Sequence, residues 1–105
     1  MAANNFYTEK DTRYVFVDGL LCDTTEKLYA TLRLQLSLPG YFGNNLDALS
    51  DVLGDLEWIP EKKVKLILLH GDLLLQSEPA KKGALLALLK KAASPRLEVI
   101  SHPPG

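Results

Sequence analysis

The sequence of 105 residues has little of what marks exported or membrane proteins. It contains one cysteine, Cys22, which cannot form a disulfide within the chain, so we expect a reducing, cytoplasmic environment. The longest apolar runs, 66–69 and 85–89, are far shorter than the roughly 20 residues of a membrane-spanning helix. Residues 1–11 are polar and contain no hydrophobic segment of the signal-peptide type. We therefore expect no membrane association.

Side chains that bind metals or catalyse reactions are also sparse. Cys22, His70 and His102 do not have the spacing of a metal site, and no glycine-rich phosphate loop precedes a Lys-Ser or Lys-Thr pair. His70 with Asp72, after a predicted strand, is the one pair from which an enzyme could be argued. No serine or cysteine nucleophile stands in a recognisable motif. We therefore expect no metal, no cofactor and no enzymatic activity.

Positive charge is missing from the middle of the chain. Twelve basic and thirteen acidic residues give a net charge of -1, yet residues 34–61 contain no lysine or arginine. The acidic residues of this segment are Asp47, Asp51, Asp55, Glu57 and Glu61. Such a surface repels the phosphates of nucleic acids and suits a basic partner. The lysine pairs elsewhere have no interleaved aromatic residues, so they do not form a single-strand RNA site.

Hydrophobic periodicity predicts alternating strands and helices without an internal repeat. We predict strands at 13–17, 63–69 and 97–100, helices from the cap residues 23–25 to 36, at 46–56 and at 80–93, and a possible helical turn at 73–76. The nearly unbroken apolar run at 64–69 indicates a strand that is buried on both faces. This order predicts one α/β domain, with a three-stranded parallel sheet and about three to four helices. We expect residues 13–101 to form this domain, and 1–12 and 102–105 to be flexible ends.

The helix predicted at 46–56 has two chemically different sides. At about 100° per residue, its apolar residues share one broad arc, and the opposite side presents Asp47, Asp51 and Asp55, with Asn44 or Asn45 as the cap. Like charges four residues apart cost a few tenths of a kcal/mol per pair. The acidic side is therefore either a solvated face that keeps a small protein soluble or a docking face for a cationic site. The charge pattern alone does not choose between them.

The loop before this helix adds a motif. Residues 38–51 are Leu-Pro-Gly-Tyr-Phe-Gly-Asn-Asn-Leu-Asp-Ala-Leu-Ser-Asp. This string resembles, without gaps, the signature Pro-x-Tyr-Tyr/Phe-Gly-x-Asn-x-Asp-Ala-Leu-x-Asp of barstar-type ribonuclease inhibitors, and the flanking elements agree in order over residues 13–100. The resemblance implies a barstar-like fold and a cytoplasmic, non-catalytic inhibitor. Its partner would be a basic ribonuclease or a nuclease toxin.

The resemblance also implies roles for individual residues. Tyr41 would be the loop aromatic that packs near the enzyme's guanine-binding loop, and Asp47 would anchor to the enzyme's cationic groups. Asp51 would be the principal carboxylate, placed where the scissile phosphate of RNA would sit. Gly43 would let the loop turn, and Asn44 would lie at the edge of the contact.

Two departures leave the target open. The familiar inhibitor has tryptophan where this chain has Ser50, and its last-helix glutamate falls near Leu89 or Lys90 here. A barstar-like interaction module that binds a basic non-nuclease partner therefore remains an alternative. Trp58 either covers the end of the core or joins an interface rim. We expect a monomer whose partner-binding residues are Tyr41, Gly43, Asn44, Asp47, Ser50, Asp51 and Asp55.

Overall fold

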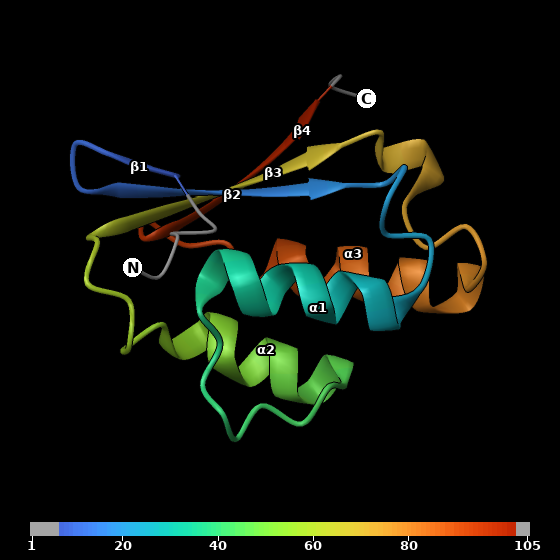
Figure 1. The fold of residues 1–105 in the computed structure, drawn as a ribbon, viewed down its shortest axis with the longest axis horizontal. Helices are drawn as coiled ribbons and strands as arrows, with labels where there is room; N and C mark the ends of the chain where they lie inside the picture. Colours follow the sequence, from blue (N-terminus) through green and yellow to red (C-terminus); the bar gives the residue numbers. More distant parts are fainter. Residues whose placement is uncertain (1–6, 103–105) are drawn as a thin grey trace.

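Three helices cover one face of a four-stranded sheet (Figure 1). The computed structural model describes residues 7–102. In chain order the elements are β1 (Tyr7–Glu9), β2 (Thr12–Asp18), α1 (Thr25–Leu36), α2 (Leu46–Asp55), β3 (Lys63–Leu69), the short 3₁₀ helix η1 (Gly71–Leu73), α3 (Pro79–Ala92) and β4 (Leu97–His102). The predicted α/β class, single domain and three helices are confirmed.

The sheet contains one strand more than the three expected. β2, β3 and β4 are parallel, with Val15 opposite Leu66 and Leu66 opposite Val99. β1 pairs antiparallel with β2 through a two-residue turn, in which Lys10 and Asp11 have φ of 52° and 63°. This left-handed turn geometry normally selects Asn-Gly or Asp-Gly, so a Lys-Asp turn leaves no sequence signal for the hairpin.

The two ends of the domain also differ from the expectation. Tyr7–Glu9 lies in the segment expected to be flexible and forms β1, and His102, assigned to the tail, is the last residue of β4. Residues 1–6 and 103–105, which were also predicted to be flexible, lie outside the described residues.

The prediction that the strand at 63–69 is buried on both faces is wrong. Val64, Leu66 and Leu68 are buried under the helices, whereas the alternate residues, such as Lys65 and Ile67, are only partly buried. All three α-helices lie on one side of the sheet (Figure 1), so no helix within residues 7–102 covers the other face. An apolar run of this length cannot distinguish a covered face from an open face that carries partly buried side chains.

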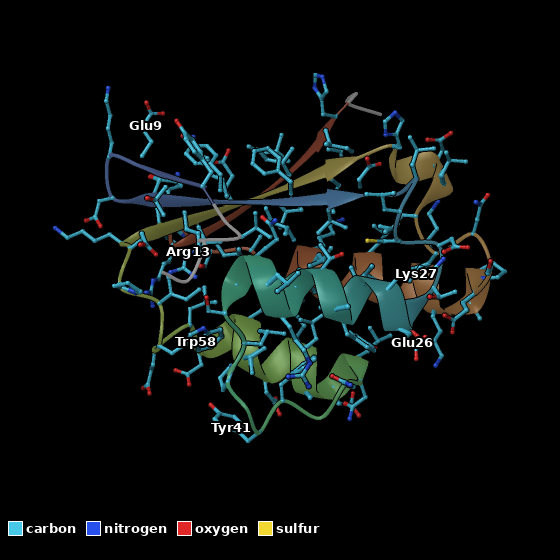
Figure 2. The ribbon with its side chains drawn as sticks, in the orientation of Figure 1. Glu9, Arg13, Glu26, Lys27, Tyr41 and Trp58 are labelled. Carbon is cyan, nitrogen blue, oxygen red and sulfur yellow. The ribbon has the colours of Figure 1, made fainter. Side chains whose placement is uncertain are left out.

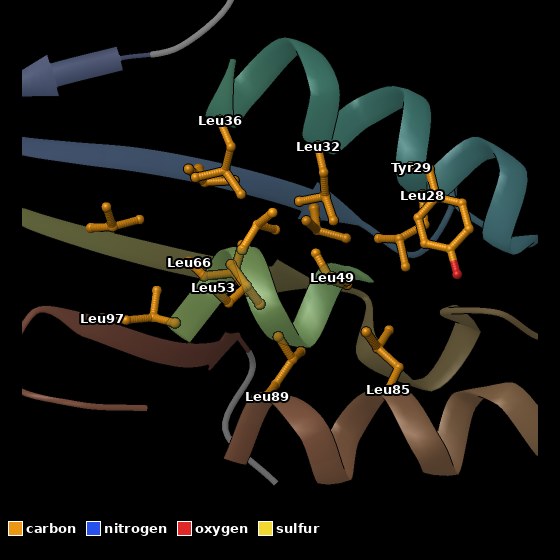
Figure 3. Close-up of a cluster of buried hydrophobic side chains, with 14 of the residues drawn as sticks. Leu28, Tyr29, Leu32, Leu36, Leu49, Leu53, Leu66, Leu85, Leu89 and Leu97 are labelled. Carbon is orange, nitrogen blue, oxygen red and sulfur yellow. The ribbon is translucent and has the colours of Figure 1, made fainter. Parts of the chain in front are cut away.

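α2 is held in place by the side chains of its apolar side. Leu49, Val52 and Leu53 are 0%, 6% and 3% exposed. They belong to a core cluster to which α1 contributes Leu32 and Leu36 and to which α3 contributes Leu85 and Leu89 (Figure 3). Such burial fixes both the position and the rotation of α2 about its axis.

The three helices run in the same direction, with their N-termini at one end of the helix layer (Figure 1). Thr24 caps α1, because its Oγ1 accepts the backbone N–H of Lys27 at 3.2 Å. The Glu78 carboxylate, which precedes α3, accepts the backbone N–H of Thr25 at 2.6 Å and the Thr25 hydroxyl at 3.1 Å. Glu78 therefore links the first turns of α1 and α3.

This link predicts a pH dependence of stability. The hydrogen bond from the Thr25 backbone N–H holds the pKa of the Glu78 carboxyl below its ordinary value. The ionised Glu78 carboxylate contributes its full stabilisation above the pKa that glutamate has in the unfolded chain, about 4.3. This stabilisation is lost as the pH falls through the lower pKa of the folded state. Glu78→Gln should therefore lower the urea midpoint at pH 7. Under acid conditions the urea midpoints of the variant and of the unmodified chain should come closer together.

The control for this measurement is Glu57→Gln, which removes one exposed carboxylate that forms no ion pair within residues 7–102. Urea midpoints would be recorded from pH 7 to pH 2.5. A Glu78→Gln curve that stays parallel to that of the unmodified chain over this range would contradict the assignment.

Candidate functional site

The predicted partner-binding residues lie on α2 and on the loop 37–45 that precedes it. α2 occupies the side of the helix layer that faces away from the sheet (Figure 1). The loop runs from the C-terminus of α1 back to the N-terminus of α2, where Asn45 caps the helix by accepting the Ala48 N–H at 2.7 Å. Loop and helix thus form one continuous outer surface.

The carboxylates of α2 point into solvent. Asp47, Asp51 and Asp55 are all exposed, and the buried residues of the helix lie on its other side. Of the ion pairs within residues 7–102, none includes these three aspartates. Their charges therefore remain available to a partner rather than being neutralised in the described part of the chain.

The loop displays one aromatic residue and buries its neighbour. Tyr41 is 78% exposed, the highest value among the large hydrophobic side chains of residues 7–102, and it projects from the loop (Figure 2). Phe42 is only 5% exposed and packs edge-on against Tyr29, with ring centroids 5.7 Å apart. The Phe42 N–H closes a turn by donating to Pro39 O at 3.0 Å. Phe42 anchors the loop, so Tyr41 stays on the outside.

The loop turns at Asn44 rather than at Gly43. Asn44 has φ 51°, in the left-handed region, whereas Gly43 has no positive φ. A Cβ at Gly43 would lie 3.3 Å from the side-chain nitrogen of Asn45. The glycine therefore leaves room for the capping side chain of α2, and the conformational role that the resemblance assigned to it belongs to Asn44.

Arg33 of α1 is a site residue that sequence reasoning missed. Its Nη2 donates to Phe42 O at 2.9 Å and to Asn44 Oδ1 at 2.6 Å, and its Nε donates to Asn44 Oδ1 at 3.2 Å. The guanidinium carbon also lies 5.2 Å from the centroid of the Phe42 ring. The only sequence signal was its position at the border of the base-free segment.

A second base approaches the acidic surface from α3. An open hollow of about 310 Å³ lies among the N-terminal ends of the three helices. Its lining includes Asn44, Asn45 and Asp47 of the loop and α2, Thr25 and Tyr29 of α1, and Lys81 of α3. The loop and the first turn of α2, which contain no base in the sequence, are therefore bordered in space by Arg33 and Lys81.

The two departures from the familiar inhibitor have distinct positions. Ser50 is half-buried on α2, so it presents little surface in place of a tryptophan. Of the two candidates for the last-helix position, Leu89 is 4% exposed and belongs to the core, whereas Lys90 is exposed. The exposed residue near that position is thus a base. Asp55 ends α2 and is exposed.

Two other candidates have structural contacts. The Trp58 indole donates to Leu36 O at 2.8 Å, and its partly buried ring packs on the core, so it covers the end of the core (Figure 2). His70 does not pair with Asp72. Its Nδ1 lies 2.9 Å from Asp18 Oδ1, and the pKa of Asp18 is lowered by a hydrogen bond from the Leu20 N–H and by His70. The pair on which an enzymatic site was considered does not form.

Comparison with known proteins identifies the family. Among residues 7–102, no helix is long and apolar enough to cross a membrane, and no three His, Cys, Asp or Glu side chains group as metal ligands. A search of curated proteins gave no match. A family model described as Barstar (barnase inhibitor) matches residues 12–98, well over half of the chain. The chain therefore belongs to the barstar family.

Proposed function

We propose that this protein inhibits a ribonuclease or a nuclease toxin by covering its cationic active site with the loop and α2. The observation that supports this most is the exposed row of Asp47, Asp51 and Asp55, which has no ion-pair partner within residues 7–102 and lies on a helix fixed by its buried side. Exposed Tyr41 extends the same surface. The description of the family as barnase inhibitors agrees with it.

The chemistry of the target explains why such a surface would inhibit. A ribonuclease must bind a phosphate, so its cleft contains arginine, lysine or histidine side chains. A carboxylate held there accepts the charge-assisted hydrogen bonds that phosphate oxygens would otherwise accept. Since α2 is already ordered by its packing, little conformational entropy is lost when it binds. The inhibitor thus imitates the RNA phosphate without being a substrate.

The three aspartates are not equivalent. Asp47 lies in the first turn of α2, where the positive end of the helix dipole stabilises a carboxylate by about 0.3–1 kcal/mol. Asp51 stands in the middle of the exposed side, and Asp55 is the last residue of the helix. We assign the principal contact to Asp51, with Asp47 and Tyr41 as the next in importance and Gly43, Asn44 and Ser50 at the edge.

The proposal also specifies where and how the protein acts. It binds the nuclease in the cytoplasm, as a monomer, without a cofactor and without catalysing a reaction. It contacts the enzyme rather than RNA, because its contact surface has the same sign of charge as RNA.

A second candidate function is a barstar-like interaction module that binds a basic protein other than a nuclease. Half-buried Ser50 provides no aromatic contact, and exposed Lys90 provides a base near the position of the family's last-helix glutamate. Both features would alter the fit to a ribonuclease. This module would retain binding through the acidic helix but inhibit no nuclease.

The first prediction compares two carboxylates of the same helix. Asp51→Ala should weaken binding to barnase by about 2–5 kcal/mol, because truncating a hydrogen-bonded charge in an interface leaves its partner groups unpaired. Asp55→Ala removes the same charge from the end of the helix and should cost much less. Inhibition constants for RNA cleavage by barnase, at low and high salt, measure both. Equal losses would remove the special role of Asp51.

The second prediction separates the two candidate functions. Tyr41→Ala should weaken inhibition of barnase by about 2 kcal/mol or more, as expected for an aromatic residue at the centre of a contact. It should leave the thermal midpoint unchanged, since Tyr41 is 78% exposed. Leu21→Ala, at a 69% exposed residue outside the loop and α2, is the control. Full inhibition by the Tyr41→Ala variant would remove the role assigned to Tyr41, whereas an unmodified chain that inhibits no ribonuclease would favour the interaction module.

A further inference from the structure

Arg33 holds the second half of the loop 37–45 by three hydrogen bonds, whereas Arg13 reaches only the start of the loop, where it donates to Ser37 Oγ at 3.4 Å. One guanidinium group satisfies two acceptors, Phe42 O and Asn44 Oδ1, which lie on either side of Gly43. A planar fork with several N–H donors can do this in one orientation, whereas a lysine has a single nitrogen. Arg33 thereby ties a rigid helix, α1, to the loop that leads into α2.

The contact fixes a backbone conformation that is otherwise uncommon. Asn44 has φ 51°, a left-handed value that non-glycine residues adopt infrequently, although asparagine tolerates it better than most. Its side chain accepts two hydrogen bonds from Arg33, which favour this conformation over the extended alternatives. The next residue, Asn45, donates to Gly43 O and accepts from Ala48 N, so the beginning of α2 depends on the turn at Asn44.

Electrostatics alone does not explain a base at this place. A cation beside an acidic docking face repels the cationic target and reduces the attraction that speeds encounter. Its benefit must therefore come from order in the loop. Tyr41 precedes the turn and Asp47 follows it, so the Arg33 guanidinium fixes the relative placement of these two proposed contact residues.

We infer that Arg33 is a positioning residue, which acts by holding the loop through Asn44 and Phe42 rather than by contacting the target. This inference rests on the proposed function for its effect on binding. Its effect on the loop does not depend on that function. An experiment can therefore measure the two effects separately.

The loop is measured first, in the free protein. Arg33→Met and Arg33→Lys should each raise the amide hydrogen-exchange rate of Phe42, whose N–H bonds to Pro39 O, by about tenfold or more, because hydrogen bonds from a charged donor are lost. The amide of Leu66 in β3 should not change. Lys91→Met, which removes one exposed charge from the last turn of α3, is the control.

Binding kinetics with barnase then distinguish positioning from charge. Both Arg33 variants should raise the dissociation rate about tenfold. Only Arg33→Met should also raise the association rate, by a few-fold at low salt, because Arg33→Lys keeps the repelling charge. A lower association rate for Arg33→Met, or full rescue by Arg33→Lys, would instead indicate a direct contact or a simple charge effect.

A double-mutant cycle tests the route through Asn44. If Arg33 acts on that side chain, removing both residues should add little to removing one. The increase in the Phe42 amide exchange rate, expressed as a free energy, should therefore be smaller in the Arg33→Met, Asn44→Ala double variant than the sum of the increases in the two single variants. Strictly additive effects, or an unchanged Phe42 exchange rate in Arg33→Met, would overturn the inference. If the unmodified chain inhibits no ribonuclease, the proposed function fails, and the exchange rates still decide the role of Arg33.

Discussion

The packing of the apolar side of α2 is the interaction on which the whole surface depends. Asp47, Asp51 and Asp55 form two like-charge pairs at i,i+4 spacing, and each pair costs a helix about 0.2–0.5 kcal/mol. Burial of one leucine or valine side chain contributes about 1.5–3 kcal/mol, and α2 buries Leu49, Val52 and Leu53. Packing outweighs repulsion several times over. The helix can therefore keep its carboxylates free of internal partners and still have one orientation.

Most of the fold follows from local patterns, and the exceptions have identifiable physical causes. Helical periodicity and cap residues predicted the three helices, because each has a buried stripe and a recognisable start, such as Asn45 before α2. β1 was missed because its turn, Lys10 and Asp11, is not the Asn-Gly or Asp-Gly pair that normally marks a two-residue hairpin turn. The prediction that β3 is buried on both faces was wrong, because its side chains alternate between the face under the helices and the face without helices. Which faces are covered is decided by distant segments and not by the strand itself.

The candidate site divides in the same way. Its acidic and aromatic residues lie within one short stretch, from Tyr41 to Asp55, so a single loop and helix were sufficient to predict that they share a surface. The bases at its border come from α1 and α3. No spacing rule connects Arg33 with Asn44, or Lys81 with Asp47, because tertiary packing brings them together. The turn at Asn44 depends on one such contact, which explains why the resemblance placed the conformational role one residue too early, at Gly43.

These bases limit how the acidic surface can work. The chain has a net charge of only -1, so at distances beyond the Debye length, about 8 Å at physiological salt, it presents almost no charge to a basic partner. Attraction must come from the local excess of carboxylates on α2, and the nearby cations Arg33 and Lys81 reduce that excess. A surface that maximised the association rate with a basic partner would carry no cation at these two positions. Their presence favours a complex whose strength comes from fixed geometry at contact, and hence from slow dissociation, more than from long-range steering.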